Sequence, residues 1–135
     1  MKLMYLFIFL LVGCSVKENY VNEDRAFGLY KRDWRGQVEY ICLKKDYTYE
    51  YVSKEKGDVI TESWEFEENS GRSAVTLYGF SSYSKVLNKY SESITQGVLV
   101  KYSHAKDAIL LRFDADDHFR DFIRIDSISN NVPND

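Results

Sequence analysis

The chain has 135 residues, with 21 acidic and 18 basic side chains and a formal net charge of −3 at pH 7. This length fits one domain, and the acidic balance argues against a nucleic-acid partner, because surfaces that bind polyanions are usually basic. Aromatic residues make up 16% of the chain and proline occurs once, at Pro133, a composition that favours β-strands.

The first element is a short apolar run. Lys2 is followed by ten uncharged and mostly apolar residues, from Leu3 to Val12. A transmembrane helix needs about 20 such residues, so the run is too short to span a bilayer but has the length of the hydrophobic region of a secretory signal. Its end, Leu11-Val12-Gly13-Cys14, resembles a bacterial lipobox, in which the signal peptide is cut before the cysteine.

The lipobox resemblance implies a lipoprotein. Residues 1–13 would be the signal peptide, and Cys14 would be the mature N-terminus, carrying a thioether-linked diacylglycerol and an amide-linked acyl chain such as palmitate. Several acyl chains anchor a protein stably in a membrane. An aspartate after the cysteine commonly signals inner-membrane retention in enteric bacteria, so Ser15 favours the outer membrane of the cell envelope, facing the periplasm. The alternatives are an ordinary secretory signal and a buried first strand.

Residues 14–26 are polar and lack a sustained period, and they are predicted to form a lipidated tether between the membrane and the folded domain. Acylation of Cys14 would leave Cys42 as a lone thiol. Because Cys42 shares a strand face with Val38 and Tyr40, we expect it to be protected by burial, as a small hydrophobic residue often is.

From residue 27 onwards, alternation of apolar and polar residues with hairpin-type breaks predicts eight strands. The predicted strands cover residues 27–31, 38–42, 47–52, 59–66, 74–80, 97–103, 108–113 and 119–126. Sequential strands with short connections form antiparallel meanders, and closure removes the two open edges. The sequence therefore predicts an all-β domain over 27–126, an eight-stranded up-and-down barrel or a strongly curved meander, followed by a frayed tail over 127–135.

Residues 81–96 depart from this alternation. Apolar residues recur there at a helix-like spacing, namely at Tyr83, Val86, Leu87, Tyr90 and Ile94. This spacing favours one short helix or a lid loop around residues 82–94, and a ninth strand is the alternative.

Several short stretches have the order of side-chain types that is typical of small bacterial lipocalin-like lipoproteins. These are Gly28-Leu29-Tyr30, Leu43 to Tyr49 with its Asp turn, Trp64, and Val75-Thr76-Leu77. The chain resembles that family over most of residues 27–125. The resemblance implies a barrel that binds a small apolar ligand or a partner protein.

The candidate ligand-binding residues are aromatic side chains that a barrel mouth or lid could present to an apolar molecule. They are Tyr47, Tyr49, Tyr51, Trp64, Tyr83 and Tyr90. The alternative is that such residues fill the barrel core.

No catalytic, metal or cofactor site stands out. His104 and His118 fall in successive turns, which lie at opposite ends of a meander, about 17–20 Å apart, too far to share a zinc ion. The acidic stretch 114–118 lacks the glycine and spacing of an EF-hand, and no Gly-x-Ser-x-Gly elbow occurs. We therefore predict that the protein is not an enzyme and needs no cofactor.

The leading functional prediction is a non-catalytic envelope lipoprotein that binds a small apolar ligand or a protein partner. One alternative is an inhibitor or immunity protein, since residues 38–42 and Ser70-Gly71 resemble periplasmic inhibitors of C-type lysozyme. The tyrosine that follows Ser-Gly in that family is absent here. Another alternative is a structural accessory of an envelope complex.

Overall fold

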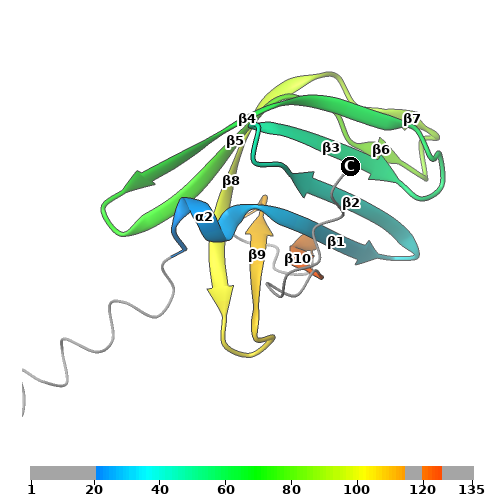
Figure 1. The fold of residues 1–135 in the computed structure, drawn as a ribbon. Coiled ribbons are helices and arrows are strands. Elements are labelled where there is room, and N and C mark those ends of the chain that lie inside the picture. The colour runs from blue at the N-terminus through cyan, green and yellow to red at the C-terminus, as the bar shows by residue number, and fades with distance from the viewer. Residues whose placement is uncertain (1–20, 115–119, 126–135) are drawn as a thin grey trace, which may run out of the picture.

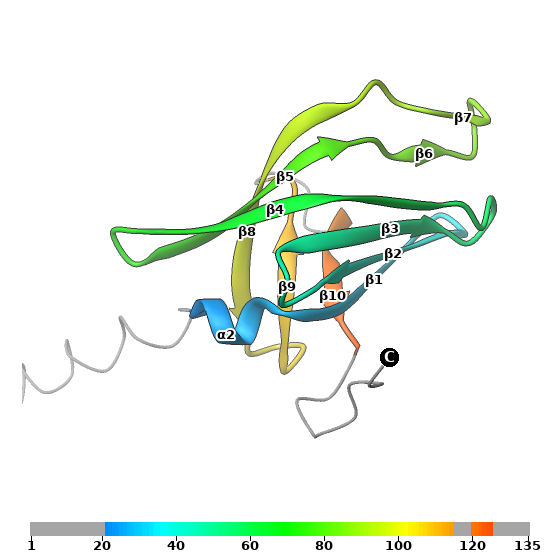
Figure 2. The same ribbon diagram turned by 45° about the horizontal axis from the view of Figure 1, so that its top comes forward.

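The computed structural model describes residues 21–114 and 120–125. Eight strands form a closed antiparallel barrel in the order β1-β10-β9-β8-β5-β4-β3-β2 (Figures 1 and 2), which confirms the predicted fold class. The barrel strands are β1 (Gly28–Trp34), β2 (Gln37–Leu43), β3 (Thr48–Ser53), β4 (Val59–Asn69), β5 (Arg72–Phe80), β8 (Ile94–Ser103), β9 (Ala108–Arg112) and β10 (Phe122–Arg124).

Two of the hairpins close with two-residue turns that the sequence specifies locally. Arg35 and Gly36 have φ values of 50° and 75° between β1 and β2, and Ser70 and Gly71 have 51° and 77° between β4 and β5. Positive φ at both central positions defines a type I′ turn, whose twist matches that of the flanking strands. These turns fix the register of both hairpins.

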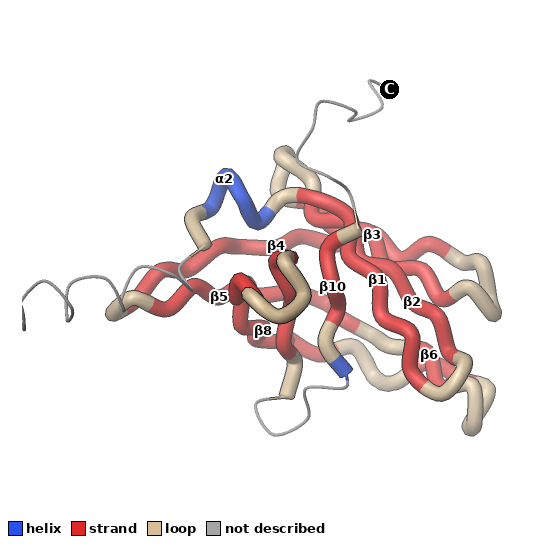
Figure 3. Tube along the Cα trace, turned by 90° about the horizontal axis from the view of Figure 1, so that it is seen from below, coloured by secondary structure: helices blue, strands red, loops and turns tan. Residues whose placement is uncertain are grey.

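The seam between β1 and β10 closes the barrel (Figure 3). Tyr30 pairs with Arg124 and Lys31 with Ile123. The residue before β10, Asp121, accepts hydrogen bonds from Nε and Nη2 of Arg112 on β9 at 3.1 and 2.9 Å. This bidentate ion pair fastens the short last strand to its neighbour, so that neither side of the seam is left as an open edge.

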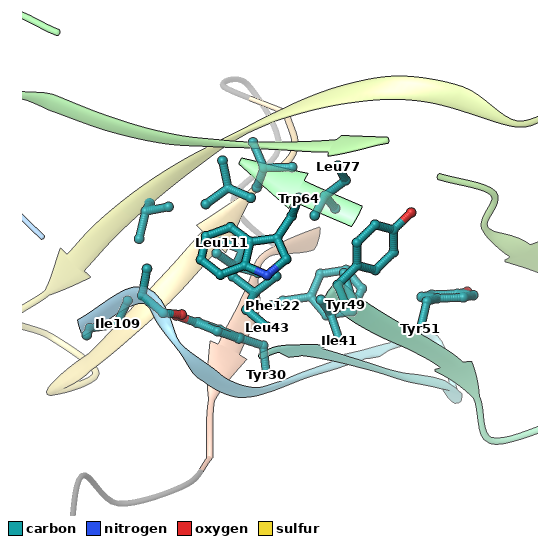
Figure 4. Packing of buried hydrophobic residues seen from close by; sticks show 14 of the residues in the cluster. Tyr30, Ile41, Leu43, Tyr49, Tyr51, Trp64, Leu77, Ile109, Leu111 and Phe122 are labelled. Atoms are coloured by element: carbon teal, nitrogen blue, oxygen red, sulfur yellow. The ribbon is translucent and has the colours of Figure 1, made fainter. Parts of the chain in front are cut away.

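The inward-facing side chains form one hydrophobic core (Figure 4). Trp64 lies near its centre, and its Nε1 donates to the carbonyl oxygens of Lys44 and Thr48, both at 3.1 Å. The hydroxyl of Tyr30 donates to the Ala26 oxygen at 2.7 Å. These hydrogen bonds replace those that the polar atoms of the buried aromatic side chains would make with water.

The folded domain begins earlier than predicted. Val21 and Ala26 are fully buried in the core, and residues Glu23–Ala26 form a short helix, α2, capped by the side chain of Asn22. Ser73 on β5 also donates a hydrogen bond to the Val21 oxygen. Assigning residues up to 26 to a polar tether was therefore wrong for residues 21–26, since a single apolar residue at each end of the helix is enough to dock it.

For residues 82–94 a short helix or a lid loop was predicted, with a strand as the alternative, and the helix is wrong. That segment contains two short strands, β6 (Tyr83–Ser84) and β7 (Lys89–Tyr90), which pair as a separate hairpin (Figure 2). Val86 in its turn is 93% exposed, so the helix-like spacing of apolar residues does not correspond to a buried face. Gln37 holds the hairpin to the barrel, donating to the Tyr83 oxygen at 2.6 Å and accepting from the Lys85 nitrogen at 2.9 Å.

The inward face of β2 is the opposite of the predicted one. Glu39, Ile41 and Leu43 are buried, and Cys42 is only partly buried on the outer face with Val38 and Tyr40. Both faces of this strand carry apolar residues, so alternation alone does not choose between them. No helix in the described part of the chain is long and apolar enough to cross a bilayer.

Candidate functional site

The predicted aromatic residues separate into three groups. Tyr49 and Tyr51 pack against Phe80 with ring centroids 6.4 and 5.4 Å apart. Tyr47 packs against Trp64 at 5.3 Å, and Tyr83 packs against Tyr90 at 5.4 Å. The six residues therefore do not line one common pocket.

The inward-facing members fill the interior of the barrel. Tyr49 and Tyr51 are fully buried and Trp64 is 1% exposed. Their polar atoms are used internally, since the Tyr49 hydroxyl donates to the Tyr78 oxygen at 2.6 Å. These three side chains form the core of the barrel, which was the alternative considered for them.

A buried ionic network lies beside this core. Glu39 is 1% exposed, and its Oε2 accepts from Nε and Nη2 of Arg32 at 2.7 and 2.6 Å. Its Oε1 accepts from the Tyr51 hydroxyl at 2.5 Å, and that hydroxyl in turn accepts from the Tyr83 nitrogen at 3.0 Å. The guanidinium of Arg32 also lies over the Phe122 ring at 4.5 Å. The network joins β1, β2, β3 and β6, and it ties the small hairpin to the barrel.

The network was not predicted, although the sequence contains its signal. Arg32 and Glu39 are direct partners across the β1–β2 hairpin, and the type I′ turn at Arg35-Gly36 sets that register. Ser53 on β3 pairs with Glu39 on β2. The buried Oγ of Ser53 has no hydrogen-bond partner among the described residues. Because both carboxylate oxygens of Glu39 are occupied within the protein, we assign the network a structural role.

Tyr47 does not continue the row of Tyr49 and Tyr51. It precedes β3 with a φ of 63° and is 44% exposed. Its ring contacts Phe27 and Trp64 with centroids 6.2 and 5.3 Å away, and its hydroxyl donates to Glu23 Oε1 at 2.8 Å. A left-handed backbone is rare for an aromatic residue, so these contacts hold the ring on the surface beside Trp64.

Tyr47 lies in an open depression of about 520 Å³ on the outside of the barrel, which we call the aromatic groove. The groove is lined by Glu23, Asp46, Tyr47, Thr48, Ser63, Trp64, Glu65, Phe66 and Tyr78. It lies where β4 runs on beyond its pairing with β3, since the β3 partners end at Ser63 while β4 continues to Asn69. In Figure 1 this part of the β4–β5 hairpin projects from the barrel near α2.

Three carboxylates, those of Glu23, Asp46 and Glu65, line the groove together with its aromatic rings. The Tyr78 hydroxyl donates to Glu65 Oε2 at 2.9 Å, and this hydrogen bond raises the pKa of Tyr78. Asp46 accepts from the Thr48 hydroxyl at 2.6 Å and from its backbone nitrogen at 3.0 Å. These hydrogen bonds lower the pKa of Asp46, so Asp46 is ionised at neutral pH.

Comparisons with known proteins yield no relative. The chain matches no protein-family model, no curated protein and no solved structure at a significant level.

A second depression, of about 500 Å³, lies on the same projecting hairpin. Its lining consists of Glu67, Asn69, Ser70, Arg72, Ala74 and Leu99. Both depressions thus lie on outer surfaces that the β4–β5 hairpin contributes to.

Neither His104 nor Asp114 lines either depression. His104 packs on Tyr102 with ring centroids 4.9 Å apart, in the turn between β8 and β9. His118 and residues 115–117 lie outside the described residues, as do Cys14 and the predicted tail 127–135. Within the described ranges, no three His, Cys, Asp or Glu side chains come together in a way that could hold a metal ion.

Stability at alkaline pH is expected to depend on Tyr49 and Tyr51. Burial first, and then Glu62 for Tyr49 and Glu39 for Tyr51, raises the pKa of both phenols far above 10. Above pH 10 the unfolded chain therefore loses protons that the folded chain retains, and the free energy of unfolding falls with pH, while below pH 10 this term is constant. Replacing Tyr49 with phenylalanine should make the decline above pH 10 shallower in urea titrations. An unchanged decline above pH 10 in the Tyr49→Phe variant would contradict the explanation.

Proposed function

We propose that this protein is a non-catalytic, lipid-anchored component of the bacterial cell envelope that binds a partner protein through the outer surface of its barrel. The observation that carries this proposal is the filled interior. Tyr49, Tyr51 and Trp64 occupy the space in which a hollow barrel would hold a small ligand. Both described depressions instead lie on the outside.

The N-terminal attachment supports a partner close to the membrane. Cys14 and Val21 are seven residues apart, a span of at most about 25 Å. Val21 is held to β5 through its hydrogen bond with Ser73. If Cys14 carries the anchor, the projecting β4–β5 hairpin is tethered within reach of the membrane surface.

The binding proposal is tested by site-specific photo-crosslinking in intact cell envelopes. A photoreactive residue is placed at exposed Ser63 in the aromatic groove, at Ser70 at the hairpin tip, and at Lys106 in the β8–β9 turn, which is outside both depressions. A discrete protein adduct at one or more of these positions is the expected result. The proposal fails if none of the three positions yields an adduct, and a small apolar molecule carried by the purified chain would in that case favour ligand binding instead.

Anchoring has its own test. Replacing Cys14 with serine is expected to abolish incorporation of labelled palmitate and to release the protein from the membrane fraction, because the acyl chains supply the stable attachment. Cys42→Ser serves as the matched control and should leave labelling intact. Labelling that persists in the Cys14 variant would contradict the lipobox assignment.

A second candidate function is inhibition of, or immunity to, an enzyme that attacks the envelope. The projecting hairpin favours it, because its tip at Ser70-Gly71 stands clear of the barrel and its β4 strand carries Glu65, Glu67 and Glu68 (Figure 1). Such an arm could enter an enzyme cleft of basic character. Addition of the purified protein should then slow the lysis of bacterial cells by a C-type lysozyme, and an unchanged lysis rate would remove that version of the candidate.

A further inference from the structure

The aromatic groove combines aromatic rings and negative charge in one depression. Tyr47, Phe66 and Tyr78 are partly exposed around the buried Trp64. Glu23, Asp46 and Glu65 add three carboxylates, and no basic residue is among the lining side chains. Aromatic faces attract cations through the ring quadrupole, and nearby carboxylates add a separate Coulombic attraction.

We propose that the aromatic groove binds a basic side chain of the partner protein, with arginine as the preferred residue. This inference rests on the proposed function and names the chemistry of its contact. A guanidinium is planar, stacks on aromatic rings and pairs with carboxylates through two parallel hydrogen bonds. The groove offers both kinds of partner, whereas an acidic side chain would be repelled from it.

The carboxylates keep the capacity to accept a ligand. Tyr47 engages only Oε1 of Glu23, and Tyr78 engages only Oε2 of Glu65. A carboxylate has about four acceptor positions, so each retains several for an incoming cation. The tyrosine hydroxyls orient the carboxylates without neutralising them.

Lys44 and Arg25, which neighbour groove residues in the sequence, are engaged elsewhere. Lys44 interacts electrostatically with Asp46, but its Nζ is held by Glu50 Oε1 at 2.6 Å. Arg25 on α2 lies over the Tyr102 ring at 5.9 Å, which is not part of the groove lining. The three carboxylates therefore present negative charge that an external basic residue can complement.

The wall of the groove is formed before any ligand arrives. Tyr47 is fixed by Phe27, Trp64 and Glu23, and Tyr78 is fixed by Glu65. Preformed aromatic walls lose little conformational entropy on binding, which favours affinity.

The test uses the full-length protein in non-ionic detergent and a fluorescein-labelled hexa-arginine amide peptide. Fluorescence anisotropy should show saturable binding of this peptide, weaker binding of hexalysine and no binding of hexaglutamate. Glu65→Lys should weaken binding about tenfold, because an attraction becomes a repulsion at the groove. Glu65→Gln, which keeps the shape, should produce a smaller loss.

Glu92→Lys provides the matched control, because Glu92 is an exposed glutamate outside the groove and the variant has the same net charge as Glu65→Lys. It should bind the peptide as the natural chain does. Absence of saturable binding, or equal weakening by both charge reversals, would overturn the inference. Crosslinks from intact envelopes at Ser70 or Lys106 would in that case leave the proposed function standing with a different contact, and absence of all crosslinks would remove both.

Discussion

Replacing Trp64 with alanine is expected to lower the free energy of unfolding by about 3–5 kcal/mol, the range found for large aromatic side chains removed from cores. Trp64 is almost fully buried at the centre of the packed interior (Figure 4). The substitution also removes the donor to the Lys44 and Thr48 oxygens. Small domains are stabilised by about 5–15 kcal/mol in total, so the variant should be partly unfolded at elevated temperature.

Urea denaturation followed by circular dichroism measures this loss. The other tryptophan, Trp34, is partly exposed at the end of β1 and supplies the matched control. Trp34→Ala is expected to lower stability by about 1 kcal/mol, the typical effect of a single substitution. Equal losses for the two tryptophans would show that the interior is not packed around Trp64.

Replacing Glu39 with alanine is expected to have an effect of similar size, about 3–5 kcal/mol, because breaking a buried ion pair leaves an uncompensated charge. Arg32 would keep its position over Phe122 without its carboxylate partner. The Tyr51 hydroxyl would lose its acceptor at the same time.

A double substitution separates the ion pair from simple packing. Replacing Arg32 with methionine and Glu39 with leucine together removes both charges, and such exchanges are often neutral or stabilising. We therefore expect the double variant to be more stable than Glu39→Ala in the same urea titration. A double variant less stable than Glu39→Ala would mean that the network contributes more than mutual neutralisation.

The sequence predicted the barrel because most of its strands have one dominant apolar face. In β3 and β5, buried residues alternate with partly exposed ones along the strand, so period-two alternation located them correctly. Chain order and short turns then left an antiparallel meander as the simplest arrangement, and the structure contains it as a closed barrel.

Period-two alternation did not identify the inward face of a strand in which both faces are apolar. In β2, Ile41 and Leu43 compete with Val38, Tyr40 and Cys42 for the inward position. The inward face of β2 includes Glu39, and its carboxylate can be buried because Arg32 and Tyr51 donate hydrogen bonds to it. A charged residue in a strand is ordinarily assigned to the outside, so its burial depends on partners that only the register reveals.

The aromatic groove could be predicted only in part. Tyr47 and Trp64 were predicted as aromatic candidates, but nothing in the sequence pattern placed the Glu65 carboxylate beside them. The groove exists because β4 is longer than β3 and because residues 21–26 dock beside it. Composition and periodicity specify neither how far two strands pair nor where one short helix docks.

The central claim is that the barrel interior is solid and that recognition uses the outer surface. Mass spectrometry of the protein purified from its native cells, without a denaturing step, tests this claim most directly. The account predicts that the mass under native conditions equals the mass of the same covalent chain under denaturing conditions. An additional small molecule that is retained in the native state and lost on denaturation would contradict it.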